Sequence, residues 1–551
     1  MAGGDQVEVN NPTPDINTKL QYLNSLINEC NLLVAQYNTD VPFNIQKYKS
    51  YRQEIQTLRS SLTPITEFQQ NIYINECEQV INAINHQRSL ISSSFNSILN
   101  LFADIESGMI ERLKEWRRVQ LLSGFDYRSR VTTIVDKSDD LKNELDTIQI
   151  QYEGLFDCVL NTRNILNTIY IINNGVNISD NVQSKFNPKI DKLLFDLISR
   201  SFIIDLQPPQ IVKRDIRFDA SVRLLLPKFL KDEQNYNVSV SIVPETMDPE
   251  RKPSGKIWVK NDRFKRYEGF LWKLSCNFKS LKLYNLDQRR GKNVTDQKHV
   301  FIFKTTVNFE GTERNVLVKS LPVVITLHPY QEPSAWATIV WNNLLEYYGR
   351  PPVASSAPWH EMSFILGKVF LSQTGCVLYD YELSYLEQRA IQLNFIRNGY
   401  ISYRRFCKTE LENLKLTFWD WFYGIMKLTR EHLSGPWNDG LIAGFIGKNK
   451  TEEILVQCVP GTFLLRFCDT FLLRFCDTRL GGISVAWVEN ENGNRCVKHL
   501  KSFISKDFDN SNLGGTTIGD HIRYIDQCMY LYRNTPKDVA FGKYYTNRSE
   551  N

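Results

Sequence analysis

Apolar residues recur at alternating spacings of three and four along three stretches near the N-terminus. These stretches are 16–37, 84–109 and 141–159, and Arg88 is the one polar member of the second stripe. Alternation of this kind is the heptad pattern of amphipathic helices whose stripes pack together. A fourth helix fits residues 190–202. The pattern therefore predicts four long helical segments before residue 204.

Breaks at 40–42 and 124–130 separate the stripes, and Pro64 is typical of the first turn of a helix. Stripes joined by short breaks favour an antiparallel four-helix coiled-coil bundle over residues 14–203, preceded by a polar tail at 1–13. An intermolecular coiled coil is the alternative interpretation. It needs a second, exposed apolar stripe, which the sequence does not demonstrate.

The periodicity changes after the Leu-Gln-Pro-Pro-Gln segment at 206–210. Short alternating or β-branched runs follow, at 216–226, 236–243, 271–283, 300–309 and 316–326. Turn-rich, basic connections separate these runs. Several short strands at this spacing are typical of an all-β sandwich, so we expect one of immunoglobulin-like type over residues 204–334.

Helical spacing returns over residues 335–433, which are rich in aromatic residues that we expect to form a core. We interpret this region as a helical spacer domain. The next region, 434–538, mixes the two periodicities and is followed by a tail at 539–551. Its expected elements are a helix at 452–457, strands at 463–467, 483–487 and 499–504, and a helix at 519–529. This mixture predicts an α+β module.

The basic residues are unevenly distributed. The whole chain has 66 Lys and Arg against 61 Asp and Glu, whereas residues 207–334 have 23 against 14. A solvated surface explains most single lysines, but clustering favours a polyanionic partner such as nucleic acid. One basic cluster spans 251–266, and it consists of Arg251, Lys252, Lys256, Lys260, Arg263, Lys265 and Arg266. A second lies at 289–293.

Other classes of function find little support in the sequence. The eleven cysteines are odd in number and form no CxxC pair, and the seven histidines are scattered, so we expect neither a disulfide framework nor a metal site. No phosphate-binding loop, HExxH or GxSxG motif is present, so we expect no enzyme and no cofactor. The polar N-terminus and the lack of a long apolar run predict a location in the cytoplasm or nucleus without membrane insertion.

One arginine stands in the middle of an otherwise apolar strand, in the segment Gly-Thr-Phe-Leu-Leu-Arg-Phe at 461–467. A buried arginine without an anionic partner is costly, and its guanidinium matches the geometry of phosphate. The polar turn Cys-Asp-Thr that follows can add backbone N–H groups and a hydroxyl. A phosphotyrosine pocket and a structural Arg–Asp pair explain this segment about equally well.

With its neighbours, this segment resembles the STAT family of phosphotyrosine-activated transcription factors. The resemblance covers nearly the whole chain in order, and several of its blocks contain tryptophan. The blocks are 115–118, 321–325, 334–341, 401–408, 418–421, 437–446, 463–467 and 540–545. The resemblance implies a coiled-coil domain, a DNA-binding sandwich, a helical linker domain and an α+β SH2 domain, in a core fragment or a shortened form.

The resemblance also implies a mechanism. A tyrosine kinase phosphorylates a tail tyrosine, two chains form a homodimer through reciprocal SH2–phosphotyrosine contacts, and the dimer moves from the cytoplasm to the nucleus and clamps double-stranded DNA. In the family the activating tyrosine lies further beyond the SH2 domain, so the resemblance leaves open whether this chain includes it. The alternative is an SH2 adaptor that binds phosphotyrosine proteins without acting on DNA.

Residues that match the family's motifs are expected to form two sites. For phosphotyrosine these are the strand arginine, Lys448 and a threonine after the strand. For DNA they are Lys213, Arg289, Arg290, Lys292 and His328. Histidine replaces a family asparagine at 328, which puts the base preference at that contact in doubt.

The strand itself is duplicated, because residues 463–470 are repeated without change as 471–478. Arg466 and Arg474 therefore compete for one phosphate pocket, as do Thr470 and Thr478. Each copy has eight residues, an even number. A register shift of the strand by one copy therefore leaves every side chain on the same face of the sheet. The expectation slightly favours Arg474, because this choice leaves the following loop intact. The repeat is either natural or a cloning or gene-model error.

Overall fold

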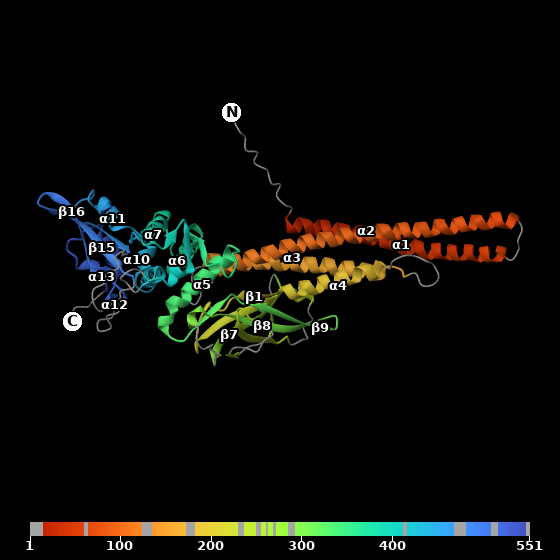
Figure 1. Ribbon diagram of the computed structural model, residues 1–551, viewed down its shortest axis with the longest axis horizontal. Helices are drawn as coiled ribbons and strands as arrows, with labels where there is room; N and C mark the ends of the chain where they lie inside the picture. Colours follow the sequence, from red (N-terminus) through yellow and green to blue (C-terminus); the bar gives the residue numbers. More distant parts are fainter. Residues whose placement is uncertain are drawn as a thin grey trace, which may run out of the picture.

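The computed structural model of the chain is elongated (Figure 1). Two long helices project at one end, a small module of strands and helices lies at the other end, and a β-sandwich lies alongside the helices. The structure describes residues 15–59, 64–123, 135–171, 182–229, 236–248, 255–259, 263–267, 271–284, 293–410, 416–467, 481–508 and 516–546. The expected tail at 1–13 lies outside these residues.

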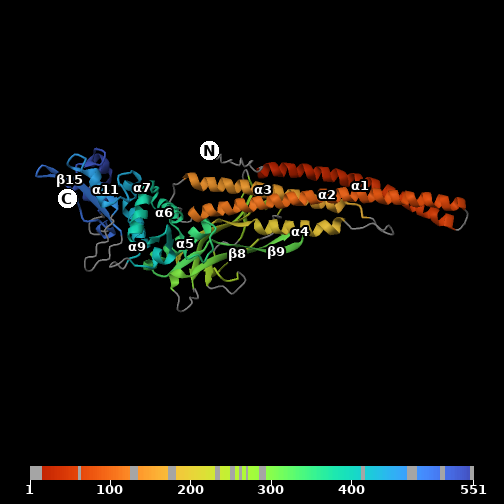
Figure 2. The same cartoon turned by 45° about the horizontal axis from the view of Figure 1, so that its top comes forward.

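Four helices form the N-terminal bundle. They are α1 (Ile16–Arg59), α2 (Pro64–Ser123), α3 (Val135–Thr168) and α4 (Val182–Arg200). The predicted stripes are buried, as shown by Leu23, Ile27 and Val34 on α1 and by Phe95 and Phe102 on α2. The helices lie side by side near the sandwich, and α1 and α2 alone continue to the far end (Figure 2). None of the described helices is both long and apolar enough to cross a membrane.

The expected break at 40–42 is wrong, because α1 continues through Pro42. Proline removes one backbone hydrogen bond from a helix and costs about 3 kcal/mol. Tyr37, Val41 and Ile45 are buried on both sides of it, so packing against α2 continues without interruption. The expected helix start at Pro64 is confirmed. The break at 124–130 lies outside the described residues.

The sandwich consists of two five-stranded sheets. The first has the order β1-β3-β7-β5 with β6 also paired to β7, and the second has the order β2-β10-β8-β4 with β9 also paired to β8. All pairs are antiparallel except β2 with β10. The strands are β1 (Phe202–Leu206), β2 (Ile211–Lys213), β3 (Arg217–Leu224), β4 (Val238–Pro244), β5 (Lys256–Trp258), β6 (Lys265–Tyr267), β7 (Lys273–Tyr284), β8 (Lys298–Phe309), β9 (Thr312–Lys319) and β10 (Val323–Thr326).

Five predicted runs correspond to strands of this sandwich, with one correction. The run at 316–326 is two strands, because Pro322 lacks the N–H needed to continue a ladder and the chain leaves β9 for β10 there. The two sheets meet through aromatic side chains: the ring centroids of Phe278 and Phe303 lie 5.4 Å apart. The all-β prediction is therefore confirmed.

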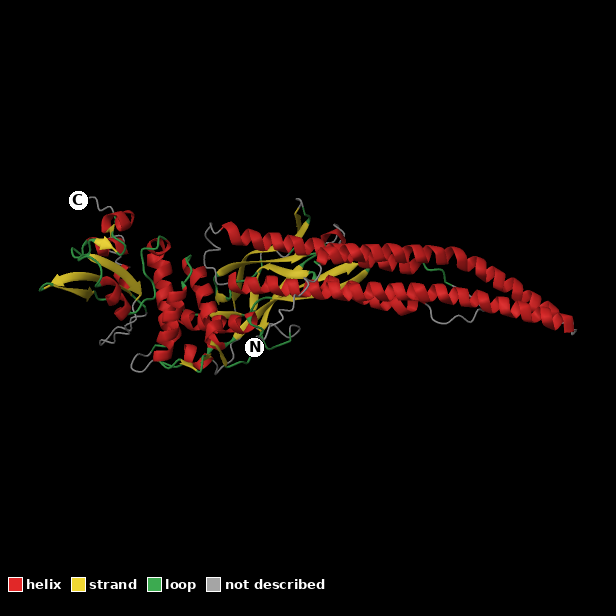
Figure 3. Cartoon of the chain, turned by 90° about the horizontal axis from the view of Figure 1, so that it is seen from above, coloured by secondary structure: helices red, strands yellow, loops and turns green. Residues whose placement is uncertain are grey.

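A polar joint fastens the bundle to the sandwich. Arg223 of β3 is buried, and its guanidinium donates to Asp146 Oδ1 at 2.8 Å and to Gln149 Oε1 at 2.9 Å, both on α3. Lys273 of β7 donates to the second Asp146 oxygen at 2.6 Å. Seen from above, the strands lie directly against the helices (Figure 3). The two domains therefore share one continuous core.

The central helical domain follows the sandwich. Its elements are α5 (Glu332–Tyr347), β11 (Ser356–Pro358), α6 (Trp359–Thr374), α7 (Asp380–Gln392), β12 (Ile396–Arg397), β13 (Tyr400–Ser402), α8 (Tyr403–Cys407) and α9 (Phe418–Leu428). The aromatic residues form its core, as expected. Phe370 of α6 packs edge-on against Phe445 and Phe467 of the next domain, with centroid distances of 5.8 and 6.1 Å. This domain and the C-terminal module thus share a second core.

The C-terminal module is built on one sheet with the order β16-β15-β14-β17-β18. Its strands are β14 (Thr462–Phe467), β15 (Ile483–Glu491), β16 (Asn494–His499), β17 (Tyr530–Leu531) and β18 (Thr535–Pro536). Its helices are α10 (Ser434–Asn438), α11 (Lys448–Leu455), α12 (Ser505–Phe508), α13 (Ile518–Arg523) and α14 (Lys537–Phe541). The α+β prediction is confirmed, and residues 539–546, expected as a tail, pack onto the module through bonds from Thr546 to Asp520.

Two expected elements of this module differ from the structure. The strand expected at 499–504 is wrong in position. The third strand, β16, lies at 494–499, because Asn492 and Gly493 have positive φ and form a two-residue hairpin turn directly after β15. Beyond His499, Phe503 forms an isolated bridge to Ile483. The helix expected at 519–529 ends at Arg523. Tyr530 then pairs with β14, and its N–H donates to the Gly461 carbonyl.

Candidate functional site

Arg466 occupies the penultimate position of β14. Every residue of this strand is buried, and Arg466 is only 2% exposed. Strand alternation places it on the same face as Leu464, which packs beneath α11, and opposite Ser484 of β15. Its Nη1 makes two long hydrogen bonds of 3.4 Å, to the carbonyls of Ile446 and Phe467. The sheet therefore holds a guanidinium beneath the N-terminal end of α11.

Three other polar side chains gather near this guanidinium. Lys448 begins α11, and its Nζ lies 3.8 Å from Glu452 Oε1. His499 at the end of β16 lies with Nε2 3.0 Å from the same oxygen. Burial lowers the pKa of His499, and the charges of Arg466 and Lys448 lower it further, while the bond to Glu452 opposes them. The cluster combines the cations Arg466 and Lys448 with a histidine ring and one carboxylate, Glu452, so an anionic ligand would compete with Glu452 for Lys448.

The structure builds β14 from the first copy of the repeat. The Gly461 N–H donates to the Val488 carbonyl at 2.8 Å, which fixes the start of the strand. Arg466 therefore stands at the strand position for which the sequence slightly favoured Arg474. Arg474, Thr470 and Thr478 lie outside the described residues. Which arginine binds phosphate stays a prediction.

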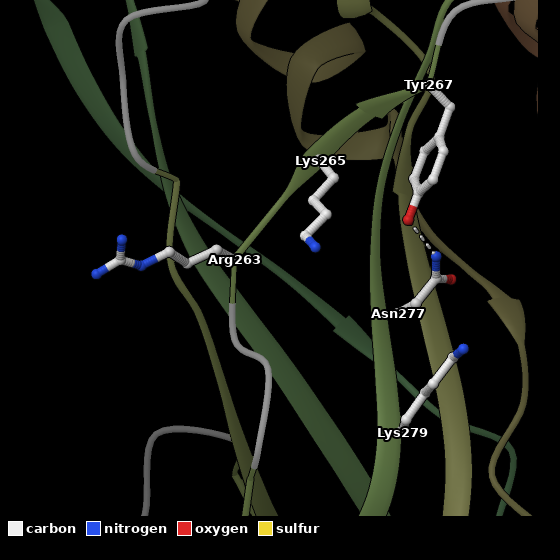
Figure 4. Close-up of a pocket in the computed structure, with 5 residues that line it drawn as sticks. All are labelled: Arg263, Lys265, Tyr267, Asn277 and Lys279. Atoms are coloured by element: carbon white, nitrogen blue, oxygen red, sulfur yellow. Dashed lines mark hydrogen bonds between the residues drawn. The ribbon is translucent and has the colours of Figure 1, made fainter.

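A second basic site lies on the sandwich, where β6 and β7 frame a cavity of about 170 Å³ (Figure 4). Arg263, Lys265 and Lys279 line it together with Tyr267 and Asn277. The Asn277 amide donates to the Tyr267 hydroxyl at 2.8 Å and orients that ring. Within the described parts of the chain, no carboxylate forms an ion pair with these three cations. The cavity therefore brings three cationic side chains together on one surface.

Lys213 and His328 come together at one end of the sandwich. Lys213 ends β2 opposite Thr326 of β10, and both Lys213 and His328 are exposed. The His328 ring stacks on Tyr330, with centroids 5.3 Å apart and planes within 8°. Gln331 Oε1 accepts from the His328 backbone N–H at 3.1 Å and fixes the turn. The other three predicted DNA contacts, Arg289, Arg290 and Lys292, lie outside the described residues.

Several of these residues were missed by sequence reasoning. Lys279 and Asn277 become part of a basic surface only because β6 pairs beside β7. His499 becomes part of the arginine cluster only through the β15–β16 hairpin. The Asn-Gly dipeptide at 492–493 was the available signal for that hairpin.

Comparison with known proteins identifies the sandwich and the central domain. The family model described as "STAT protein, DNA binding domain" matches residues 206–326. The one described as "Signal transducer and activator of transcription, linker domain" matches residues 351–422. The chain belongs to the STAT family.

Curated relatives carry the same family name. A "Signal transducer and transcription activator" of Anopheles gambiae is 32% identical over 430 residues, which are 73% of this chain and 57% of that protein. One of Drosophila melanogaster is 33% identical over 383 residues, which are 64% of this chain and 48% of that protein. This STAT chain therefore spans about half the length of these relatives.

Proposed function

We propose that this STAT chain is a phosphotyrosine-regulated transcription factor that binds DNA in a sequence-specific manner. The observation that carries the proposal is the basic sandwich, which matches a STAT DNA-binding domain and gathers the cations Arg263, Lys265 and Lys279 on one surface. DNA phosphates are the polyanion such a surface suits. The names of the curated relatives support the same function.

The switch in this proposal is the C-terminal module, which acts as an SH2 domain. Arg466 and Lys448 contact the phosphate of a phosphotyrosine, which carries about −1.5 to −2 charges at pH 7. A tyrosine kinase supplies that group, and reciprocal binding between two chains gives a two-fold homodimer whose sandwiches grip one duplex. The dimer carries the signal from the cytoplasm to the nucleus, without a cofactor or a catalytic step.

Duplex binding by the full chain tests the DNA half of this proposal. We expect the affinity for a labelled duplex to fall steeply between about 50 and 200 mM salt, because bound cations release counterions from DNA. Replacing both Lys265 and Lys279 with alanine should reduce the slope of log affinity against log salt by about 2. The matched control is Lys319→Ala, on the other sheet.

If the chain is instead an SH2 adaptor that does not bind DNA, this experiment gives a different result. Duplex affinity would then be weak, and the double variant would bind like the parent chain and like Lys319→Ala. That outcome would favour the adaptor, provided that phosphotyrosine binding is retained.

A further inference from the structure

A short irregular segment, Ala443 to Ile446, lies directly beside Arg466. The Ala443 N–H donates to the Leu465 carbonyl and the Phe467 N–H donates to the Gly444 carbonyl, both at 2.8 Å. These two bonds bracket Arg466 along the strand. The Ile446 carbonyl then accepts from Arg466 Nη1 at 3.4 Å. The position of the guanidinium therefore depends on where this segment lies.

The other side of the segment is held by the central helical domain. Glu382 and Tyr381, in the first turn of α7, reach across the domain boundary. Glu382 Oε1 accepts from the Phe445 N–H at 3.0 Å, and the Tyr381 hydroxyl donates to the Ala443 carbonyl at 3.1 Å. Segment 443–446 is thus bonded to α7 on one side and to β14 on the other.

Gly444 permits this close approach. It has a φ of +77°, and a Cβ at this position would lie 1.8 Å from Glu382 Oε1. Only glycine combines that backbone conformation with such a short distance to the carboxylate. The fit between α7 and the segment is therefore specific to this sequence.

Within the part of the chain that the structure describes, no cation pairs with the Glu382 carboxyl group. Its side chain is fully buried, and within the described residues its partners are the N–H groups of Phe445 and, at 2.9 Å, Tyr379. Burial raises the pKa of Glu382 to about 7, against the opposing effect of these two bonds. The bond from Tyr379 caps the start of α7, whereas the bond from Phe445 crosses into the next domain.

We propose that Tyr381 and Glu382 are positioning residues for Arg466, which fix segment 443–446 so that the guanidinium faces a bound phosphate. This inference rests on the proposed phosphotyrosine function and deepens it. Phosphotyrosine affinity then depends on a helix in the neighbouring domain that does not touch the ligand.

The test measures binding of a fluorescent phosphotyrosine peptide to the full chain and to two variants. Tyr381→Phe removes one hydrogen bond, and we expect an affinity loss of about threefold. Glu382→Gln places an amide NH₂ against a backbone N–H, and we expect a loss of about tenfold. The matched control is Glu387→Gln, exposed on the same helix, which should bind like the parent chain.

Two readouts separate positioning from general destabilisation. Hydrogen exchange should rise in 443–446 of both variants. The duplex affinity of the unphosphorylated chain, which does not depend on reciprocal phosphotyrosine contacts, should stay at the parent value because the sandwich is untouched. In an Arg466→Lys background the effect of Tyr381→Phe should shrink, since residues that act through one group are not additive. If the Glu382→Gln variant does not fold, the Tyr381→Phe variant alone still tests the positioning role.

The outcomes distinguish this inference from the function on which it rests. A parent chain that binds no phosphotyrosine peptide would overturn the proposed switch itself. A parent chain that binds, with Tyr381→Phe and Glu382→Gln as tight as the parent, would overturn the positioning role alone. An undiminished effect of Tyr381→Phe in the Arg466→Lys background would also overturn it.

Discussion

Arg466, Arg223 and Glu382 each carry an ionisable group and are each almost fully buried. Arg223 is compensated by Asp146 across a domain boundary, whereas Glu382 is held by backbone N–H groups. Arg466 lies beside backbone carbonyls and near a second cation, Lys448. At the residue scale, Arg223 serves architecture, and we assign Arg466 and Glu382 to a binding site.

Glu382 predicts a pH dependence of stability. Because its pKa is raised from 4.5 to about 7, the folded protein binds this proton more tightly than the unfolded chain. Stability should therefore fall as pH rises from about 4.5 to 7, by on the order of 3 kcal/mol from this group. Glu382→Gln should remove this contribution to the pH dependence of the unfolding free energy, measured by denaturant unfolding between about pH 4.5 and 7. Parallel slopes for the parent and the variant would contradict the assignment.

The sequence could predict Arg466 but not Glu382. A single cation in an otherwise apolar strand of six residues is visible in the sequence. The duplication left two candidate positions for it, 466 and 474, but arginine stands at both. Glu382 is one of many acidic residues, and its partner is a backbone N–H 63 positions away. Almost any residue can offer a backbone N–H, so the identity of the partner residue does not reveal such a hydrogen bond. The tertiary structure is needed to find it.

Elements with strong local periodicity could be predicted from sequence, and those fixed by their neighbours could not. The heptad stripes predict α1, α2 and α3, because the spacing itself specifies which face is buried. Strands β2, β5 and β6 have three residues each, too few for an alternating pattern. At Pro42 the local sequence predicted a helix break that the structure does not have, because packing along α1 outweighs one lost hydrogen bond.

At the scale of elements, the contact between α3 and the sandwich predicts which substitution destabilises the fold. Asp146→Ala leaves Arg223 buried without its carboxylate and also frees Lys273, so we expect a loss of about 3 kcal/mol in unfolding free energy. The comparison is Glu111→Ala, which breaks an exposed ion pair with Lys114 on α2. Exposed pairs contribute little, so this variant should unfold like the parent. Equal effects of both substitutions would contradict the proposed role of the joint.

At the scale of the whole molecule, most buried apolar residues of the four domains fall into two large cores. The bundle and the sandwich share one, and the central helical domain and the C-terminal module share the other. Cooperative unfolding follows continuous cores, so calorimetry should resolve two transitions. Asp146→Ala should lower the temperature of one transition and leave the other unchanged. A single transition, shifted as a whole, would show that the cores are coupled.

The order of domains could be predicted from sequence because each has its own periodicity. The sharing of cores could not, because it depends on contacts such as Phe370 with Phe467, which are almost a hundred residues apart. This sharing matters for function, since it places the helix that holds segment 443–446 in the same rigid unit as β14.

Binding of a fluorescent phosphotyrosine peptide to the parent chain, Arg466→Ala and Arg474→Ala tests the central claim most directly. We expect the parent to bind the phosphorylated peptide and not its unphosphorylated twin. Arg466→Ala should weaken binding about 100-fold or more, because it removes the buried phosphate ligand, and Arg474→Ala should stay within about threefold of the parent. Loss with Arg474→Ala alone would assign the pocket to the second copy, and no binding by the parent would contradict a phosphotyrosine switch in this chain.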